Sequence, residues 1–84
     1  MSAAAIAGFF ARIHGREGED LQEAFANEAI ETGGHWWPTR DPLNGQALFE
    51  IHLHGVTAIG LSLDDAIRSW RRKARARLED PNAA

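Results

Sequence analysis

The segment from Glu50 to Gly55, EIHLHG, holds three side chains whose types and spacing could do chemistry. Glu50, His52 and His54 recur at every second position, and alternate residues of a β-strand point to the same face. Two such imidazoles can bind one metal ion, with Glu50 or His35 as a third ligand. The solvent-facing side of any half-buried strand also produces this alternation of polar residues. The sequence favours this second interpretation, and we expect no cofactor.

The turn after the second histidine decides whether the two imidazoles stay together. If His54 and Gly55 form a type I′ turn, both need a positive φ, and His54 leaves the face of the strand. If Gly55 and Val56 form a type II′ turn, only Gly55 needs a positive φ, and His54 stays beside His52. Because glycine adopts positive φ freely and histidine only occasionally, the sequence favours the type II′ turn.

A second group of chemical interest is the basic segment RSWRRKARAR, which spans residues 68–77 and contains six bases and no acid. Four arginines in it follow the i, i+3, i+4, i+7 spacing of one helical face: Arg68, Arg71, Arg72 and Arg75. Arginine forms paired hydrogen bonds with carboxylates and phosphates. The segment therefore predicts contact with an acidic protein surface or with nucleic-acid phosphates, against the simple alternative of a solvated face.

Two adjacent tryptophans, Trp36 and Trp37, stand in the sequence HWWP. One periodicity cannot bury both rings, so we expect one of them at the rim of the core and the other on the surface. An exposed tryptophan is a favoured anchor in protein interfaces. We therefore count Trp36 and Trp37 with the four arginines as candidate partner-binding residues.

Patterns that would indicate an enzyme are missing from the sequence. There is no glycine-rich phosphate loop and no nucleophile elbow, and Ser62 is better explained as a helix cap. Asp64 and Asp65 occupy the first turn of a helix, where acids are favoured by the helix dipole. We therefore expect no catalytic residue and no enzymatic activity.

The composition describes one small domain of 84 residues with a net charge of −3. The absence of cysteine excludes disulfides and thiolate metal sites, and it fits a cytoplasmic protein. No apolar run approaches the roughly 20 residues that span a membrane, so we expect no membrane contact. The charges are segregated, because residues 17–31 carry acids and no base. These acids could pair with the basic segment inside the molecule.

Hydrophobic periodicity predicts an α+β fold in the order ααββα. The expected elements are helices over residues 3–14 and 19–31, a largely irregular connector over 33–45, strands over 49–54 and 56–60, and a last helix that Ser62 caps. The ends, residues 1–2 and 80–84, are expected to be flexible. Small residues at positions 58 and 60 leave room for the last helix to lie close to the hairpin, with Trp70 filling the gap.

The hairpin leaves the sheet incomplete, because two strands alone are marginally stable and expose two edges. Residues His35 to Trp37 could add a short strand, and Pro38 would restrict it to an edge. Alternatively, two copies could pair through the hairpin edge as a homodimer. Both completions stay open at the level of sequence.

The run FEIHLHGVTAIGLSLDDAIRSWRRKAR resembles the hairpin–helix end of small accessory proteins encoded by phages and related mobile elements. It is similar, more loosely, to the strand–helix junction of HicB-type antitoxins. Accessory proteins of this size include anti-CRISPR inhibitors, which act by binding and need no cofactor. The resemblance implies a regulatory or inhibitory protein that occupies a protein or a protein–nucleic-acid complex. The alternatives are direct nucleic-acid binding by the basic helix and metal binding through His52 and His54.

Overall fold

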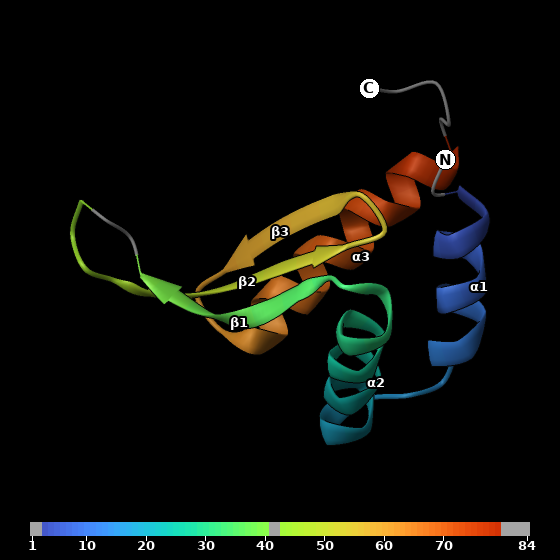
Figure 1. Ribbon diagram of the computed structural model, residues 1–84, viewed down its shortest axis with the longest axis horizontal. Helices are drawn as coiled ribbons and strands as arrows, with labels where there is room; N and C mark the ends of the chain where they lie inside the picture. The colour runs from blue at the N-terminus through green and yellow to red at the C-terminus, as the bar shows by residue number, and fades with distance from the viewer. Residues whose placement is uncertain (1–2, 41–42, 80–84) are drawn as a thin grey trace.

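The computed structural model describes residues 3–40 and 43–79; the ends expected to be flexible lie outside these residues. The elements are α1 (Ala3–Ile13), α2 (Gly18–Thr32), β1 (His35–Arg40), β2 (Ala47–Leu53), β3 (Val56–Gly60) and α3 (Leu63–Glu79). The predicted α+β class is confirmed, with one strand more than the hairpin (Figure 1). Within the described ranges, none of the helices combines the length and apolar character needed to cross a membrane.

The three strands form one antiparallel sheet in the order β1-β2-β3. The extra strand, β1, pairs with β2 so that His35 lies opposite His52. The short edge strand that the sequence left open at His35–Trp37 is thus confirmed, and it extends to Arg40. The assignment of residues 35–40 to an irregular connector is wrong. Pro38 is tolerated within β1 because this strand lies at the edge of the sheet, where a missing N–H breaks no ladder.

Both outer strands carry a feature that opposes pairing with another sheet. Pro38 interrupts the donors of β1, and the ammonium of Lys73 donates a hydrogen bond to the carbonyl oxygen of Thr57 in β3 at 3.1 Å. Proline and lysine at edges are common ways to prevent edge-to-edge association. Because β1 supplies the third strand from within the chain, the sheet does not need a strand from a second copy. A homodimer through the hairpin edge stays a prediction.

The core lies between one face of the sheet and the helices. Ile51 and Ala58 point into it from β2 and β3, and α3 passes behind these strands (Figure 1). Trp70 of α3 is fully buried, and its indole N–H donates to the carbonyl oxygen of Leu53 at 3.2 Å, so the ring leaves no unsatisfied donor. A Cβ on Gly60 would lie 2.3 Å from the backbone nitrogen of Ala66. The predicted close approach of the last helix is therefore confirmed.

The ends of two helices follow from their sequences. Gly33 has a φ of 72° and donates its N–H to Ala29, which ends α2. The hydroxyl of Ser62 accepts a hydrogen bond from the N–H of Asp65 at 3.1 Å, which begins α3 as expected.

The turn between β2 and β3 differs from the preferred prediction. His54 has a φ of 52° and Gly55 a φ of 77°, and Leu53 pairs with Val56. These values describe the type I′ turn, so the preference for a type II′ turn is wrong. The cost of a left-handed histidine is offset by a hydrogen bond from its imidazole to Glu28, a residue of α2.

Candidate functional site

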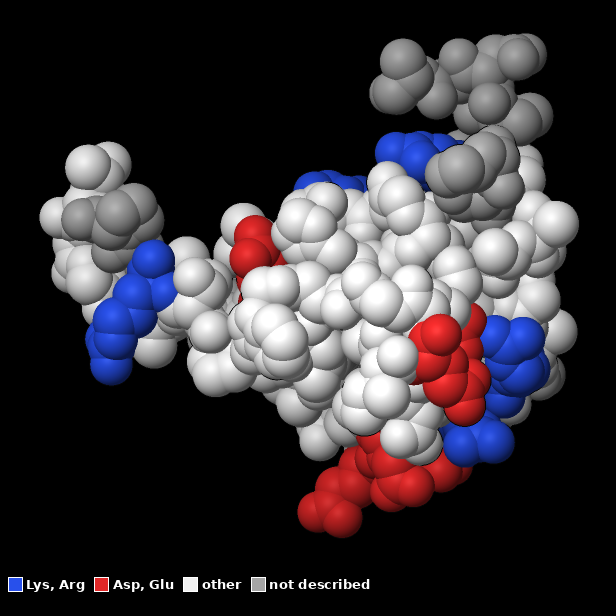
Figure 2. Space-filling view, viewed as in Figure 1, with Lys and Arg blue, Asp and Glu red and all other residues white. Residues whose placement is uncertain are grey.

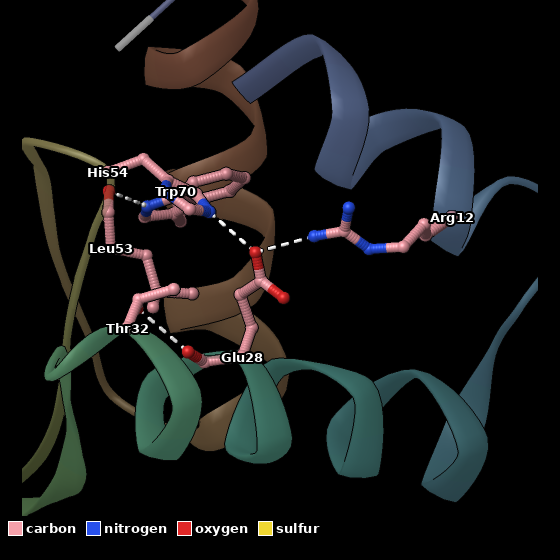
Figure 3. Close-up of polar contacts among 6 residues, drawn as sticks. All are labelled: Arg12, Glu28, Thr32, Leu53, His54 and Trp70. Atoms are coloured by element: carbon pink, nitrogen blue, oxygen red, sulfur yellow. Dashed lines mark hydrogen bonds and ion pairs between the residues drawn. The ribbon is translucent and has the colours of Figure 1, made fainter. Parts of the chain in front are cut away.

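The polar residues of EIHLHG do not form one row. Glu50 and His52 lie on the open face of the sheet, where His35 joins them from β1. The Glu50 carboxylate lies 3.3 Å from Nε2 of His35 and 3.3 Å from Nε2 of His52. His54 lies apart from this group and reaches toward α2 (Figure 3).

His52 and His54 therefore do not converge on one metal ion. The side chain of His52 is 48% exposed, whereas that of His54 is 9% exposed and bonded to Glu28. In the part of the chain that the structure describes, no group of three or more ligating side chains could hold a metal. The suggested metal site at His52 and His54 thus loses its geometric basis.

Glu28 is the centre of a partly buried polar cluster that our interpretation of the sequence missed. Its Oε2 accepts hydrogen bonds from Nη2 of Arg12 at 2.6 Å and from Nε2 of His54 at 2.7 Å (Figure 3). This cluster connects α1, α2 and the β2–β3 turn. A signal was present, because Glu28 stands seven residues after Leu21 and three after Phe25, on the apolar face of α2. The cluster is a structural tie between three elements.

The four predicted arginines share one groove along α3. Its volume is about 640 Å³. It is lined by Asp64, Ile67, Arg68, Arg71, Arg72 and Arg75 of α3 and by Gly18 and Leu21 of α2. The helical spacing read from the sequence therefore does bring these guanidinium groups to one concave surface, which we call the arginine groove.

Few of the positive charges in the arginine groove are neutralised within the molecule. Arg68 forms an ion pair with Asp65 at 2.9 Å, in which the Arg68 side chain is 72% exposed and the Asp65 side chain 42% exposed. Arg72 makes one long hydrogen bond, 3.5 Å, to the hydroxyl of Ser69. Arg71 has no hydrogen bond or ion pair with any described residue. Three of the four arginines, counting Arg75, thus carry no ion pair within residues 3–40 and 43–79.

The groove combines a narrow apolar floor with a charged rim. Leu21 and Ile67, which line it, are only 8% and 4% exposed and belong to the core. The guanidinium of Arg75 lies 5.5 Å from the ring centre of Phe10 in α1. This cation–π contact holds Arg75 at the groove while its N–H groups stay available.

The acids of α2 do not neutralise the arginine groove. Glu28 and Asp20 pair with arginines outside α3, and the polar contact between α2 and α3 joins Gln22 to Asp64 at 3.2 Å. Figure 2 shows acidic side chains gathered at the lower end of the molecule, where Figure 1 places the first turns of α2. Pairing of the acidic helix with the basic helix, which the charge pattern suggested, is absent from the described residues.

The two tryptophans separate as expected, but neither lines the arginine groove. Trp36 packs at the core rim against Phe25 and Phe49, with ring centres 5.8 Å and 5.0 Å away. Trp37 is 56% exposed and lies against His35. Trp37 is therefore free for an apolar contact, whereas Trp36 is mainly a packing residue.

The comparisons with known proteins assign the chain to no family. No family model matches the sequence, and no curated protein and no solved structure is significantly similar to the chain. The geometry and charge of the arginine groove are thus the main guide to function.

Proposed function

We propose that the protein is a small non-enzymatic binding module that uses the arginine groove to occupy an anionic surface of a macromolecular partner. One observation carries this proposal: four guanidinium groups line a single groove, and three of them have no ion pair among the described residues. Guanidinium groups form paired hydrogen bonds with carboxylates and phosphates. The groove therefore offers several such contacts side by side.

The cost of this arrangement also supports a binding role. Arg68 and Arg72 are four residues apart on α3, as are Arg71 and Arg75. Like charges at this spacing destabilise a helix by about 0.2–0.5 kcal/mol per pair. An anionic ligand bound between these arginines would relieve that repulsion. A helix that only had to be soluble could mix acids among these bases at no such cost.

In this proposal the module acts in the cytoplasm, without a cofactor, by occupying a protein or a protein–nucleic-acid complex. The resemblance to phage accessory proteins and anti-CRISPR inhibitors is the ground for a regulatory or inhibitory role. Trp37 would supply an apolar anchor on a second surface, outside the groove.

Direct nucleic-acid binding by the same helix is the second candidate. It is favoured by the exposure of Arg72 and Arg75, which phosphates can reach without any rearrangement. Binding of this kind weakens steeply as salt rises, because each phosphate contact releases counterions. A gel shift at low salt that disappears at higher salt would support it.

Affinity capture from a lysate of the organism that carries the gene tests the proposal. The wild-type chain and the Arg71→Gln/Arg72→Gln variant are immobilised in parallel, before and after nuclease treatment. The matched control is Arg16→Gln/Arg40→Gln, which removes the same charge outside the groove. We expect a nuclease-resistant protein partner that is lost only from the groove variant. Equal capture by all three chains would contradict the proposal, and a partner lost after nuclease would favour the second candidate.

A further inference from the structure

The floor of the arginine groove distinguishes between classes of anionic partner. The aliphatic stems of the four arginines give it apolar surface. Leu21 and Ile67 add only a narrow strip between them, because these core residues are 8% and 4% exposed. A phosphodiester backbone has no apolar side chains to place there. A protein segment can present carboxylates and apolar side chains together, and it would use both parts of the groove.

The length of the arginine row matches two turns of a helix. Arg68 and Arg75 are seven residues apart, which is about 10 Å along the axis of α3. A partner helix with carboxylates at i, i+3, i+4 and i+7 spreads them over the same length of its own axis. Amphipathic helices that bind grooves use anchors at this spacing. Carboxylates and guanidinium groups could then meet turn for turn.

The surroundings of the groove oppose a long polyanion. Asp64 lies in its lining, and Glu17 and Glu19 flank Gly18 at its α2 side. Double-stranded DNA carries a negative charge about every 1.7 Å, so a duplex would extend past the arginines toward these acids. The net charge of −3 adds repulsion at longer range. A partner helix can place bases opposite the same acids.

We infer that the arginine groove binds an amphipathic helix of a partner protein, with a row of carboxylates facing the guanidinium groups of α3 and apolar side chains against the arginine stems and the narrow strip of Leu21 and Ile67 between them. This inference rests on the proposed function and specifies the chemistry of its ligand. It selects a protein helix over nucleic acid for the same surface.

The test uses a synthetic peptide of about five helical turns, with glutamates at i, i+3, i+4 and i+7, leucines beside them and lysines on one flank. Two matched peptides replace the glutamates by glutamine or the leucines by serine. The other probes are a DNA duplex of about 20 base pairs and a single-stranded RNA of similar length. Fluorescence anisotropy at about 0.15 M salt gives each dissociation constant. Circular dichroism confirms that every protein variant is folded.

We expect the glutamate–leucine peptide to bind at least about tenfold more tightly than either matched peptide or either nucleic acid. Arg71→Gln/Arg72→Gln should weaken it by about tenfold, because two charge-assisted contacts are lost. Arg16→Gln/Arg40→Gln should leave the affinity within about twofold of wild type.

Each contrary outcome has a distinct meaning. Tighter binding of DNA or RNA, lost in the groove variant, would overturn the inference and leave an anion-binding groove in place. Equal binding of the serine peptide would also overturn it, because the floor would then contribute nothing. If no probe binds, or if the groove variant and its control behave alike, the inference and the proposed function both fail.

Discussion

Glu28 makes hydrogen bonds of nearly equal length to two partners that differ in exposure to water. The distances are 2.6 Å to Arg12 and 2.7 Å to His54, both at Oε2 (Figure 3). The exposed fractions of the side chains are 8% for Glu28, 9% for His54 and 59% for Arg12. If solvent exposure controls the energy of such contacts, the contact with His54 should stabilise the fold more than the contact with Arg12.

The expected energies follow from these exposures. The contact with Arg12 is screened by water and should contribute about 0.2–1 kcal/mol. The contact with His54 is buried and should contribute about 1.5–3 kcal/mol, as hydrogen bonds to charged groups do. Glu28→Ala leaves the imidazole N–H of His54 without its acceptor and should cost about 2–4 kcal/mol. For a chain of 84 residues, whose total stability is expected near 4–13 kcal/mol, that loss is large.

Two double-mutant cycles measure the energies separately. Urea denaturation gives the free energy of unfolding for Glu28→Ala, Arg12→Ala, His54→Asn and the two doubles that contain Glu28→Ala. Asparagine tolerates the positive φ of position 54, so the backbone cost is small and cancels within the cycle. A second series with Glu28→Gln keeps the side-chain volume and should give the same ranking with smaller values. A coupling of Glu28 to Arg12 as large as its coupling to His54 would refute the reasoning.

Other predictions concern packing and exposure. Gly60→Ala should destabilise the fold by about 1–3 kcal/mol, because the new Cβ would overlap the backbone of Ala66. In contrast, Gly8→Ala should stabilise α1 by about 0.5–1 kcal/mol, since the nearest atom outside the adjoining helix backbone, Nη1 of Arg12, lies 3.6 Å from that Cβ. Urea denaturation gives the change in the free energy of unfolding for both variants. Equal effects of the two substitutions would contradict the tight packing at Gly60 and the free space at Gly8. Trp36→Ser should cost about 2 kcal/mol or more through lost ring contacts, and Trp37→Ser less than about 1 kcal/mol. Thermal melts rank the stabilities of these two variants. A larger loss for Trp37→Ser than for Trp36→Ser would contradict the assignment of Trp36 as the packed ring and Trp37 as the exposed ring.

The elements that the sequence predicted correctly are those whose signals are local. Gly33 and Ser62 mark helix ends through their own conformation and hydroxyl group, and each performs that role here. The alternation of Ile51 and Leu53 with polar residues follows from the two-residue period of a strand. The arginines gather in one groove because helical spacing alone puts them on one face.

The errors all involve contacts between distant residues. The turn at His54 depends on Glu28, which is 26 residues away, so the conformational preference of histidine alone gave the wrong turn type. The sequence left a strand at His35–Trp37 open but did not show that it pairs with β2 or that it continues through Pro38 to Arg40, because its own composition does not reveal its partner. The groove itself needs Leu21 of α2 beside α3, an arrangement that depends on the whole fold.

A titration followed by backbone amide chemical shifts tests the role of the arginine groove most directly. The ¹⁵N-labelled chain is titrated with the glutamate–leucine peptide at about 0.15 M salt, and the shifted amides are mapped onto the fold. The account predicts that the largest changes fall on residues 67–75 of α3 and 18–21 of α2, and that Arg71→Gln/Arg72→Gln abolishes them. Changes centred instead on the open face of the sheet, around Trp37 and Ile59, would contradict it, as would the absence of any change.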